Sequence, residues 1–347
     1  MAARLKIRNS DRTLKVHHTA AVKHNAEVMQ TVKWEALAAG PLIAFHAGCI
    51  LGDVLYLHGG VEEKSSPTPS NKFHSYNMST SEWIEIQEAG SPALSHHACV
   101  VIENRYIVLI GGWDGKVRTS AVYIYDTDKR KWTMPQVLGF SDQGGLSAHT
   151  ASLLASGEIL VIGREGGLHM QRCHGDAYIL SCDVEKRVCK YCNYTSSVSS
   201  RSGHTTNIVG NAAYIIGGRG DQLLERLLRF SPSSFPPSSG PIFSKLSNFL
   251  CTPLTKVPCG RKNHIALSGP GFIFVHGGET FDGRIREPVG EMYLVTIKPS
   301  VQWFAVRGQS LGRAGHVCCT DGNRVLLHGG LTGRGQVCGD VRELTIS

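Results

Sequence analysis

A segment of about 50 residues is repeated along this chain, and the repeat constrains the fold more than any other feature of the sequence. Its clearest marker is a pair of glycines, found at Gly59-Gly60, Gly111-Gly112, Gly217-Gly218, Gly277-Gly278 and Gly329-Gly330, with a degraded copy at Gly163-Arg164. Successive pairs begin 52, 52, 54, 60 and 52 positions apart. This regular spacing predicts an array of one supersecondary unit, because such units bury their apolar faces against each other.

A histidine precedes each pair by 13 or 14 residues, at His46, His97, His149, His204, His264 and His316. Two apolar runs separated by a turn lie between the histidine and the glycines, as in residues 98–102 and 106–110. This pattern predicts a β-hairpin. Two more short strands follow the glycines, and the last carries a tryptophan in several copies, such as Trp83, Trp132 and Trp303. Each unit is therefore predicted to be a sheet of four short antiparallel strands.

These units resemble kelch repeats, which have a period of about 50 residues and four strands per blade. The resemblance covers residues 31–347 and implies an all-β fold, a six-bladed kelch β-propeller. The sixth copy ends after its third strand, whereas an unassigned strand around Trp34, residues 31–37, precedes the first histidine. We expect this N-terminal strand to complete the C-terminal blade, because closing the ring removes exposed strand edges.

The repeats account for nearly all of the 347 residues, so we predict one propeller domain at 31–347. Residues 1–30 carry six basic and two acidic side chains, which is four of the eight excess positive charges. We interpret them as a basic, partly disordered extension, and nucleic acid is not an expected partner. A Ser/Pro-rich stretch at 231–241 predicts a loop between the third and fourth strands of the fourth blade, because proline does not fit a central strand.

No run approaches 18 uncharged apolar residues, and the first residues alternate charged with apolar side chains. Neither a transmembrane helix nor a signal peptide is predicted. The eleven cysteines fall mostly in predicted strands, where they behave as small apolar residues and fit a reducing compartment. We therefore expect a cytoplasmic or nuclear protein with no membrane partner.

The histidines, glycines and tryptophans that recur once per blade are spread around a ring instead of gathering at one point. We therefore interpret them as scaffold residues. A zinc site at Cys182, Cys189 and Cys192, with Cys173-His174 upstream, is not expected, because residues three apart in a strand point to opposite faces. The sequence predicts no catalytic residue, no metal and no cofactor.

Positions that differ between repeats carry more information about function. Residues just before the first strand and just after the second lie at the same end of the hairpin, and in kelch propellers this end commonly binds partners. Arginine predominates there, and its planar group pairs bidentately with carboxylates. The predicted partner-binding residues are Arg164, Arg201, Arg219, Arg261, Arg313, Arg334 and Trp113.

We therefore predict a non-catalytic adaptor that binds an acidic or carboxylate-bearing segment of a partner protein, such as its C-terminus, and no small-molecule substrate. Two alternatives follow from the resemblance. Many kelch proteins are substrate receptors of ubiquitin ligases, although no BTB domain or recruitment box is visible in this sequence. Some kelch-like propellers are sugar oxidases or isomerases, whose chemistry needs a clustered site that the sequence does not show.

Overall fold

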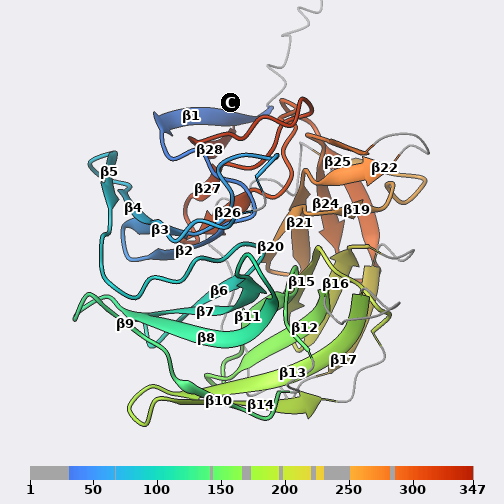
Figure 1. Cartoon of the computed structure of the whole chain (residues 1–347). Helices are drawn as coiled ribbons and strands as arrows, with labels where there is room; N and C mark the ends of the chain where they lie inside the picture. Colours follow the sequence, from blue (N-terminus) through green and yellow to red (C-terminus); the bar gives the residue numbers. More distant parts are fainter. Residues whose placement is uncertain are drawn as a thin grey trace, which may run out of the picture.

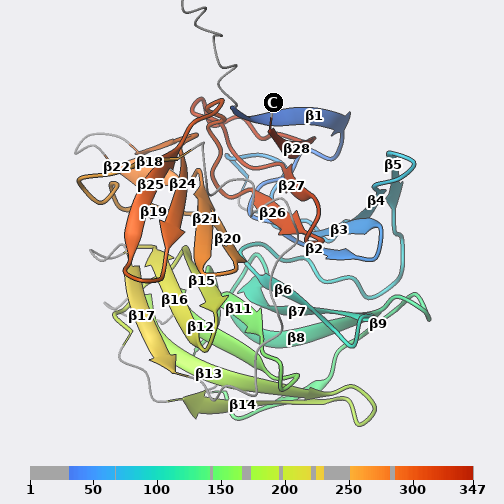
Figure 2. The same cartoon turned by 180° about the vertical axis from the view of Figure 1, so that it is seen from behind.

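A computed structural model describes residues 31–66, 68–140, 144–165, 173–194, 198–219, 224–229, 251–281 and 286–346. Short sheets stand around a central axis like the blades of a propeller (Figures 1 and 2). The described residues form strands and no helix, which confirms the all-β prediction. Within them, no helix has the length and apolar character that crossing a bilayer requires. The extension at 1–30 and the Ser/Pro-rich stretch at 231–241 lie outside the described residues.

The first three blades are built from consecutive strands, with the innermost strand first. Blade 1 contains β2 (Ala47–Leu51), β3 (Val54–His58), β4 (Phe73–Asn77) and β5 (Glu82–Glu85). Blade 2 contains β6 (Ala98–Ile102), β7 (Tyr106–Trp113), β8 (Arg118–Asp126) and β9 (Lys131–Thr133). Blade 3 contains β11 (Thr150–Leu153), β12 (Ile159–Glu165), β13 (Cys173–Asp183) and β14 (Val188–Tyr194), and β10 (Gln136–Leu138) joins β14 in parallel as the outermost strand.

The last three blades vary more. The described strands of blade 4 are β15 (His204–Val209), β16 (Ala212–Gly217) and β17 (Leu224–Arg229). Blade 5 contains β20 (Ile265–Gly269), β21 (Phe272–His276), β24 (Met292–Thr296) and β25 (Gln302–Val306), with β18 (Cys251–Pro253) at its outer edge. A small separate sheet contains β19 (Arg261–Lys262), β22 (Glu279–Phe281) and β23 (Arg286–Pro288). Blade 6 contains β26 (Val317–Thr320), β27 (Val325–His328), β28 (Asp340–Ile346) and β1 (Val32–Ala39).

The N-terminal strand β1 is the outer strand of the last blade. It pairs antiparallel with β28 from Val32 opposite Ile346 to Ala39 opposite Asp340. The side chain of Trp34 is 2% exposed and packs among residues of blades 5 and 6. The strand predicted around Trp34 therefore occupies the place that the sequence assigns to it.

A closed circuit of backbone hydrogen bonds joins the blades at the centre. The residue before each repeated histidine donates its N–H to the carbonyl of the equivalent residue in the preceding blade, with N···O distances of 2.7 to 2.9 Å. The circuit consists of Phe45, His96, Ala148, Gly203, Asn263 and Gly315. Their φ angles lie between 50° and 67°, a left-handed conformation that costs a non-glycine residue about 1 to 2 kcal/mol. Because Phe45 donates back to Gly315, the ring is closed.

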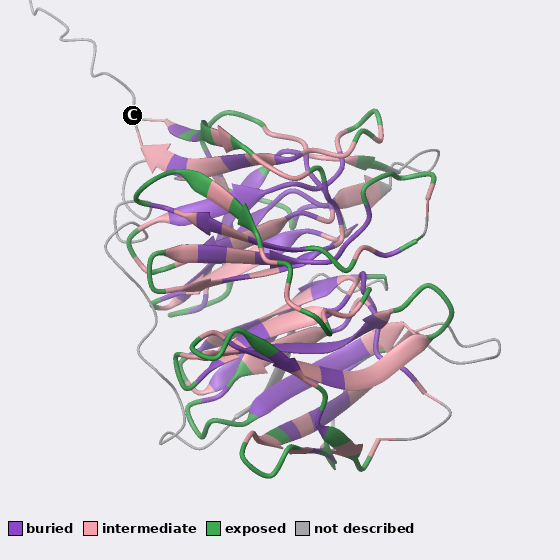
Figure 3. Ribbon diagram, turned by 60° about the vertical axis from the view of Figure 1, so that its left-hand side comes forward, coloured by how far each residue is buried: buried purple, intermediate pink, exposed green. Residues whose placement is uncertain are grey.

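The apolar core is divided among the interfaces between neighbouring blades. Each apolar cluster of the described residues joins two adjacent blades. In β7, Ile107 and Leu109 pack against blade 1 while Val108 and Ile110 pack against blade 3, because successive side chains of a strand point to opposite faces. The second strands are thus largely buried on both sides, which explains their continuous apolar runs. Buried residues lie mainly in the strands and exposed residues mainly in the loops (Figure 3).

The glycine pairs allow the blades to approach each other. In five blades the second glycine donates its N–H to the carbonyl three residues before the next blade's histidine, at 2.7 to 2.9 Å. A Cβ on the first glycine would lie 3.0 Å or less from the imidazole Cε1 of that histidine in every blade. The scaffold role predicted for the glycines is therefore confirmed. Blade 3 departs from the pattern, since Arg164 replaces the second glycine. The register shift between Ile162 and Arg164 is shared with blade 2, where it lies between Ile110 and Gly112.

Candidate protein-binding face

The repeated histidines are buried neutral groups between the blades. Each is 5 to 7% exposed. The Nε2 atoms of His46, His97 and His316 pair with the Nδ1 atoms of His328, His58 and His276 in the preceding blades, at 3.1, 3.0 and 3.1 Å. Burial lowers the pKa of all six, to about 4 for His149 and to about 3 for His204 and His264. Their pairing and burial agree with a structural role.

Three of the predicted binding residues are also buried. Arg201, Arg261 and Arg313 are 0%, 2% and 6% exposed. Arg201 and Arg261 each donate from Nη1 to the carbonyl of the first glycine in their own blade, at 2.9 and 3.0 Å. Arg261 also lies 2.9 Å from Glu291, and Arg313 lies 3.0 Å from Asp340. These guanidinium groups hold the ends of the hairpins, so the prediction that they face a partner is wrong.

The same register position is buried in every blade. Three residues before the histidine, the first three blades have Ile43, Leu94 and Leu146, which are 2%, 1% and 0% exposed. An arginine fits this site because its aliphatic stem is apolar and its charged end reaches a carbonyl. The apolar residues at this position in the first three repeats indicate that the position is buried in all six.

Partly exposed charges gather at the face with the glycine pairs, where blades 2, 3 and 4 meet. Nη2 of Arg118 lies 3.4 Å from Oε1 of Glu165, and Nη1 of Arg219 lies 3.9 Å from the same oxygen. The two arginine side chains are 36% and 47% exposed. The guanidinium carbon of Arg118 lies 5.7 Å from the ring centroid of Trp113. The structure thus brings Trp113 and Arg219 together and adds Arg118, which the sequence analysis missed.

The mouth of the central channel lies beside this cluster. Phe45 and His96 stack there, with ring centroids 4.4 Å apart. Burial, with the charges of Lys262 and Arg118, lowers the pKa of His96 to about 4. Lys262 is 29% exposed and lies 3.0 Å from Glu279. Below the mouth is a cavity of about 160 Å³, lined by the residues of the backbone circuit and by the six repeated histidines.

The remaining two predicted residues do not join the cluster in the same way. Arg164 is 12% exposed, and its Nη2 lies 3.0 Å from Asp176. Arg334 is exposed on the loop between β27 and β28. It adjoins a groove of about 550 Å³ whose lining includes the exposed side chain of Leu42 and Glu63. Arg334 therefore belongs to the edge of the face at blades 1 and 6.

All eleven cysteines are free thiols. Cys182 lies directly opposite Cys189 across β13 and β14, whereas Cys192 lies opposite Ile179. A hydrogen bond with Cys182, together with burial, raises the pKa of the Cys189 thiol. Among the residues that the structure describes, no group of three or more His, Cys, Asp or Glu side chains is arranged to hold a metal ion.

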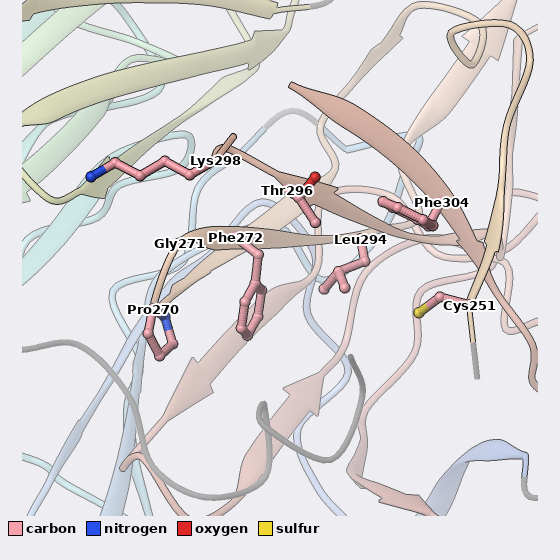
Figure 4. Close-up of a pocket in the computed structure, with 8 residues that line it drawn as sticks. All are labelled: Cys251, Pro270, Gly271, Phe272, Leu294, Thr296, Lys298 and Phe304. Atoms are coloured by element: carbon pink, nitrogen blue, oxygen red, sulfur yellow. The ribbon is translucent and has the colours of Figure 1, made fainter. Parts of the chain in front are cut away.

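A second cavity, of about 380 Å³, lies at the end of blade 5 that carries the β20–β21 turn (Figure 4). Phe272, Leu294 and Phe304 form apolar walls, and Lys298 points away from them. This end is opposite to the one with the glycine pairs, because each hairpin turn lies at the far end of its strands. The cavity is therefore separate from the charged cluster.

The antiparallel blades form a closed ring, and a histidine and a glycine make a close contact between each blade and the next. The fold is therefore a β-propeller built from sequence repeats. The family model described as the KLHDC2/KLHL20/DRC7 Kelch-repeats domain matches residues 17–218, which is more than half of the chain. The chain therefore belongs to the kelch-repeat family.

Several proteins are similar over most of their length. Kelch domain-containing protein 9 of Mus musculus is 30% identical over 333 residues, which are 89% of this chain and 95% of that protein. Kelch domain-containing protein 3 of Homo sapiens is 24% identical, over 86% of this chain and 80% of that protein. The solved structure titled "Structure of YjhT" has a TM-score of 0.63 at 13% identity, covering 90% of this chain and 99% of that one, and it shows the shared fold.

Proposed function

We propose that this propeller is a non-catalytic protein-interaction module that holds an acidic or carboxylate-bearing segment of a partner over the mouth of the central channel. The main support is that Arg118 of blade 2, Arg219 just beyond the end of β16 in blade 4 and Lys262 of the small sheet beside blade 5 are partly exposed at one face. Trp113 lies beside them and offers an aromatic surface. Guanidinium groups pair bidentately with carboxylates, which suits this chemistry.

The charges at this site leave room for a partner's carboxylate. Arg118 and Arg219 share the single carboxylate of Glu165, and Lys262 pairs with Glu279. Three positive groups therefore face two negative ones. Partly exposed ion pairs of this kind contribute only about 0 to 1 kcal/mol, so a partner's carboxylate replaces them at little cost.

Charge reversal at the face tests this proposal. The variant Arg118→Glu, Arg219→Glu, Lys262→Glu should lose binding to acidic peptides in fluorescence anisotropy and lose partners in affinity purification, with little change in melting temperature. A matched control reverses three lysines that are exposed on other parts of the ring, Lys33, Lys131 and Lys190. If the first variant keeps its partners and deletion of residues 1–28 removes them, the N-terminal extension binds and the face proposal is wrong.

Salt should weaken the interaction. Raising the ionic strength from 0.15 M to 1 M shortens the Debye length from about 8 Å to about 3 Å. Because the proposed contacts are between partly exposed charges, we expect the dissociation constant to rise several-fold. A dissociation constant that does not change with salt would indicate that apolar contacts dominate.

We also propose that the protein works in the cytoplasm or nucleus. The eleven free thiols support this, because disulfides are rare in reducing compartments. The sequence Asn77-Met78-Ser79 is a glycosylation acceptor that would be modified in a secreted protein. Fluorescence microscopy of the tagged chain should show an intracellular signal, and glycan attached to Asn77 would contradict the proposal.

A further inference from the structure

Two cysteines of blade 3 face each other across a β-hairpin. Cys182 of β13 lies directly opposite Cys189 of β14, on neighbouring strands (Figure 1), so their side chains point to the same side of the sheet. Both residues belong to the apolar cluster between blades 2 and 3. Among the strand pairings that the structure describes, no other cysteine lies opposite a cysteine. The pair is therefore placed for a reaction between its two thiols.

The hairpin that carries this pair has counterparts in blades 1 and 2. In all three blades a turn of four residues joins the third strand to the fourth, and its last residue has a left-handed conformation with φ of 50° to 60°. The second pair of residues from the turn is aromatic in the other two blades: Tyr76 with Trp83, and Tyr125 with Trp132. Cys182 and Cys189 take the place of this aromatic pair in blade 3.

The backbone register sets the separation of the two cysteines. In blade 1 Ile86 donates its N–H to the carbonyl of Phe73 at 2.7 Å, so these two residues form a hydrogen-bonded pair. Hydrogen-bonded and non-hydrogen-bonded pairs alternate, and Tyr76 with Trp83, three pairs further along, is therefore of the second type. The same turn in blade 3 gives the cysteine pair the same type, with Cα atoms about 4.5 Å apart. This separation lies within the range of about 4.4 to 6.8 Å that a disulfide requires.

The two thiols differ in exposure and in protonation. Cys182 is partly exposed, whereas Cys189 is buried. A hydrogen bond with Cys182, together with burial, raises the pKa of the Cys189 thiol, so Cys189 keeps its proton and donates it to the sulfur of Cys182. Because the thiolate is the nucleophile, Cys189 is the less reactive thiol towards an oxidant from solution. An oxidant therefore reacts first with Cys182, and Cys189 is the thiol beside it.

We propose that Cys182 and Cys189 are a modification site, at which a peroxide converts the two thiols into a disulfide. In the first step the sulfur of Cys182 takes one oxygen from hydrogen peroxide. The O–O bond breaks, and the other hydroxyl leaves as water with the proton of Cys182, which gives a sulfenic acid. In the second step the sulfur of Cys189 displaces the hydroxyl of the sulfenic acid, which leaves as water with the proton of Cys189. The two thiols lose two electrons, and the peroxide is reduced to two waters.

The bond would join β13 covalently to β14 at the position where aromatic side chains pack in blades 1 and 2. In a reducing compartment such a disulfide is transient, because cellular thiols reduce it again. The site does not depend on which partner the propeller binds.

Hydrogen peroxide is the probe for this site. The full chain is treated with peroxide, its remaining thiols are blocked with N-ethylmaleimide, and it is digested with trypsin. Because Lys186 and Arg187 lie between the two cysteines, trypsin places them on separate peptides that only a disulfide joins. We expect the joined peptides, lighter by two hydrogen atoms than the two thiol peptides together, and their separation by dithiothreitol. Fragment spectra distinguish Cys182 from Cys173, which is on the same tryptic peptide.

Cys192 provides the matched control. It is exposed on the same strand as Cys189 but lies opposite Ile179, so no thiol faces it across the hairpin. Cys192→Ser should keep the joined peptides, whereas Cys182→Ser and Cys189→Ser should each lose them. Alanine replaces serine in any variant that does not fold. If no joined peptides form at a peroxide dose that oxidises Cys192, or if Cys189 is joined to another cysteine, the inference is wrong.

Dimedone, which labels sulfenic acids, tests the order of the two steps. In the Cys189→Ala variant no thiol lies opposite Cys182, so its sulfenic acid should persist and be labelled. In the Cys182→Ala variant the buried Cys189 should be labelled about tenfold less. Labelling of Cys189 equal to that of Cys182 would refute the order assigned to the two thiols.

Discussion

At the scale of single residues, a comparison of Gly217 with Gly210 distinguishes the two reasons for a glycine, a left-handed backbone and a close contact with the next blade. Both belong to blade 4, and their φ angles are 63° and 60°. A Cβ at Gly217 would lie 2.4 Å from the carbonyl oxygen of Arg261 and 2.9 Å from Cε1 of His264. A Cβ at Gly210 would meet no atom within 4 Å. Backbone strain is therefore the same at the two sites, and only the contact with the next blade differs.

We expect Gly217→Ala to lower the free energy of unfolding by about 3 kcal/mol or more, because blades 4 and 5 must separate to admit the methyl group. Gly210→Ala should cost only about 1 kcal/mol, the strain of a left-handed alanine. Urea denaturation of the two variants measures the difference. Equal losses would contradict the role assigned to the close approach of the blades.

Arg261 gives a second residue-scale prediction. Arg261→Ala should lower the free energy of unfolding by about 2 kcal/mol, because the buried carbonyl of Gly277 loses its donor and the stem leaves a cavity. Its partner Glu291 is 52% exposed, so loss of the ion pair itself adds little. Arg334→Ala on the exposed loop should stay within about 0.5 kcal/mol. Thermal melts compare the two, and a harmless Arg261→Ala would contradict its structural role.

The roles of the histidines and glycines could be predicted from the sequence, whereas those of the arginines could not. The spacing of histidines and glycines was enough to assign them to the scaffold. Considered one at a time, the arginines before the first strands resemble surface residues. The position is recognisable as buried only because the first three repeats have Ile43, Leu94 and Leu146 there. Arg118 carries no repeat signal, because it follows a loop whose length varies between blades.

At the scale of elements, the buried side chains on one face of β1 attach this strand to the last blade. Val32 and Trp34 are 0% and 2% exposed, whereas Leu37 is 37% exposed. Trp34→Ala should therefore cost about 3 to 5 kcal/mol, and Leu37→Ala on the same strand much less. Chemical denaturation compares the two variants. Similar small losses would show that β1 contributes little to the last blade.

Removal of residues 1–40 tests the whole strand. Without β1, the edge of β28 is unpaired and the apolar cluster between blades 5 and 6 loses Val32 and Trp34. We expect a lower melting temperature and a tendency to aggregate, followed by circular dichroism and light scattering. A melting temperature equal to that of the intact chain would contradict the role of β1 in closing the ring.

The sequence predicted the strands that alternate or repeat and missed the others. β2, β3 and their equivalents recur in six copies, so each copy supports the rest. The short strands β10 and β18 lie in the links between blades and have three residues each, too few to show a period. The charged cluster depends on how blades 2, 3 and 4 are arranged around the axis. The spacing of residues along the sequence does not give this arrangement.

At the scale of the whole molecule, buried neutral histidines couple stability to pH. The six repeated histidines and His58, His276 and His328 are all 7% exposed or less. Burial lowers the pKa of His58, His276 and His328 to about 3, against an ordinary value of 6.5. Below pH 6.5 the unfolded chain takes up protons that the folded chain does not. Stability is therefore complete above pH 6.5 and falls as the pH decreases towards 3.

We expect acid unfolding between about pH 5 and pH 6. Each such histidine contributes up to about 1.4 kcal/mol per pH unit, so nine together approach the whole stability of a domain. Tryptophan fluorescence and circular dichroism during acid titration measure the midpoint. A native spectrum that persists to pH 4 would contradict this prediction.

The circuit of six backbone hydrogen bonds has no first or last member, and the paired residues Val32 and Ile346 bring the two ends of the described chain together. The contacts between the blades therefore do not depend on which blade comes first in the sequence. A circularly permuted chain, with a short linker joining the present ends and new ends in the link between β9 and β11, would contain the same inter-blade contacts. The six hydrogen bonds of the circuit would be the same whichever link carried the new ends.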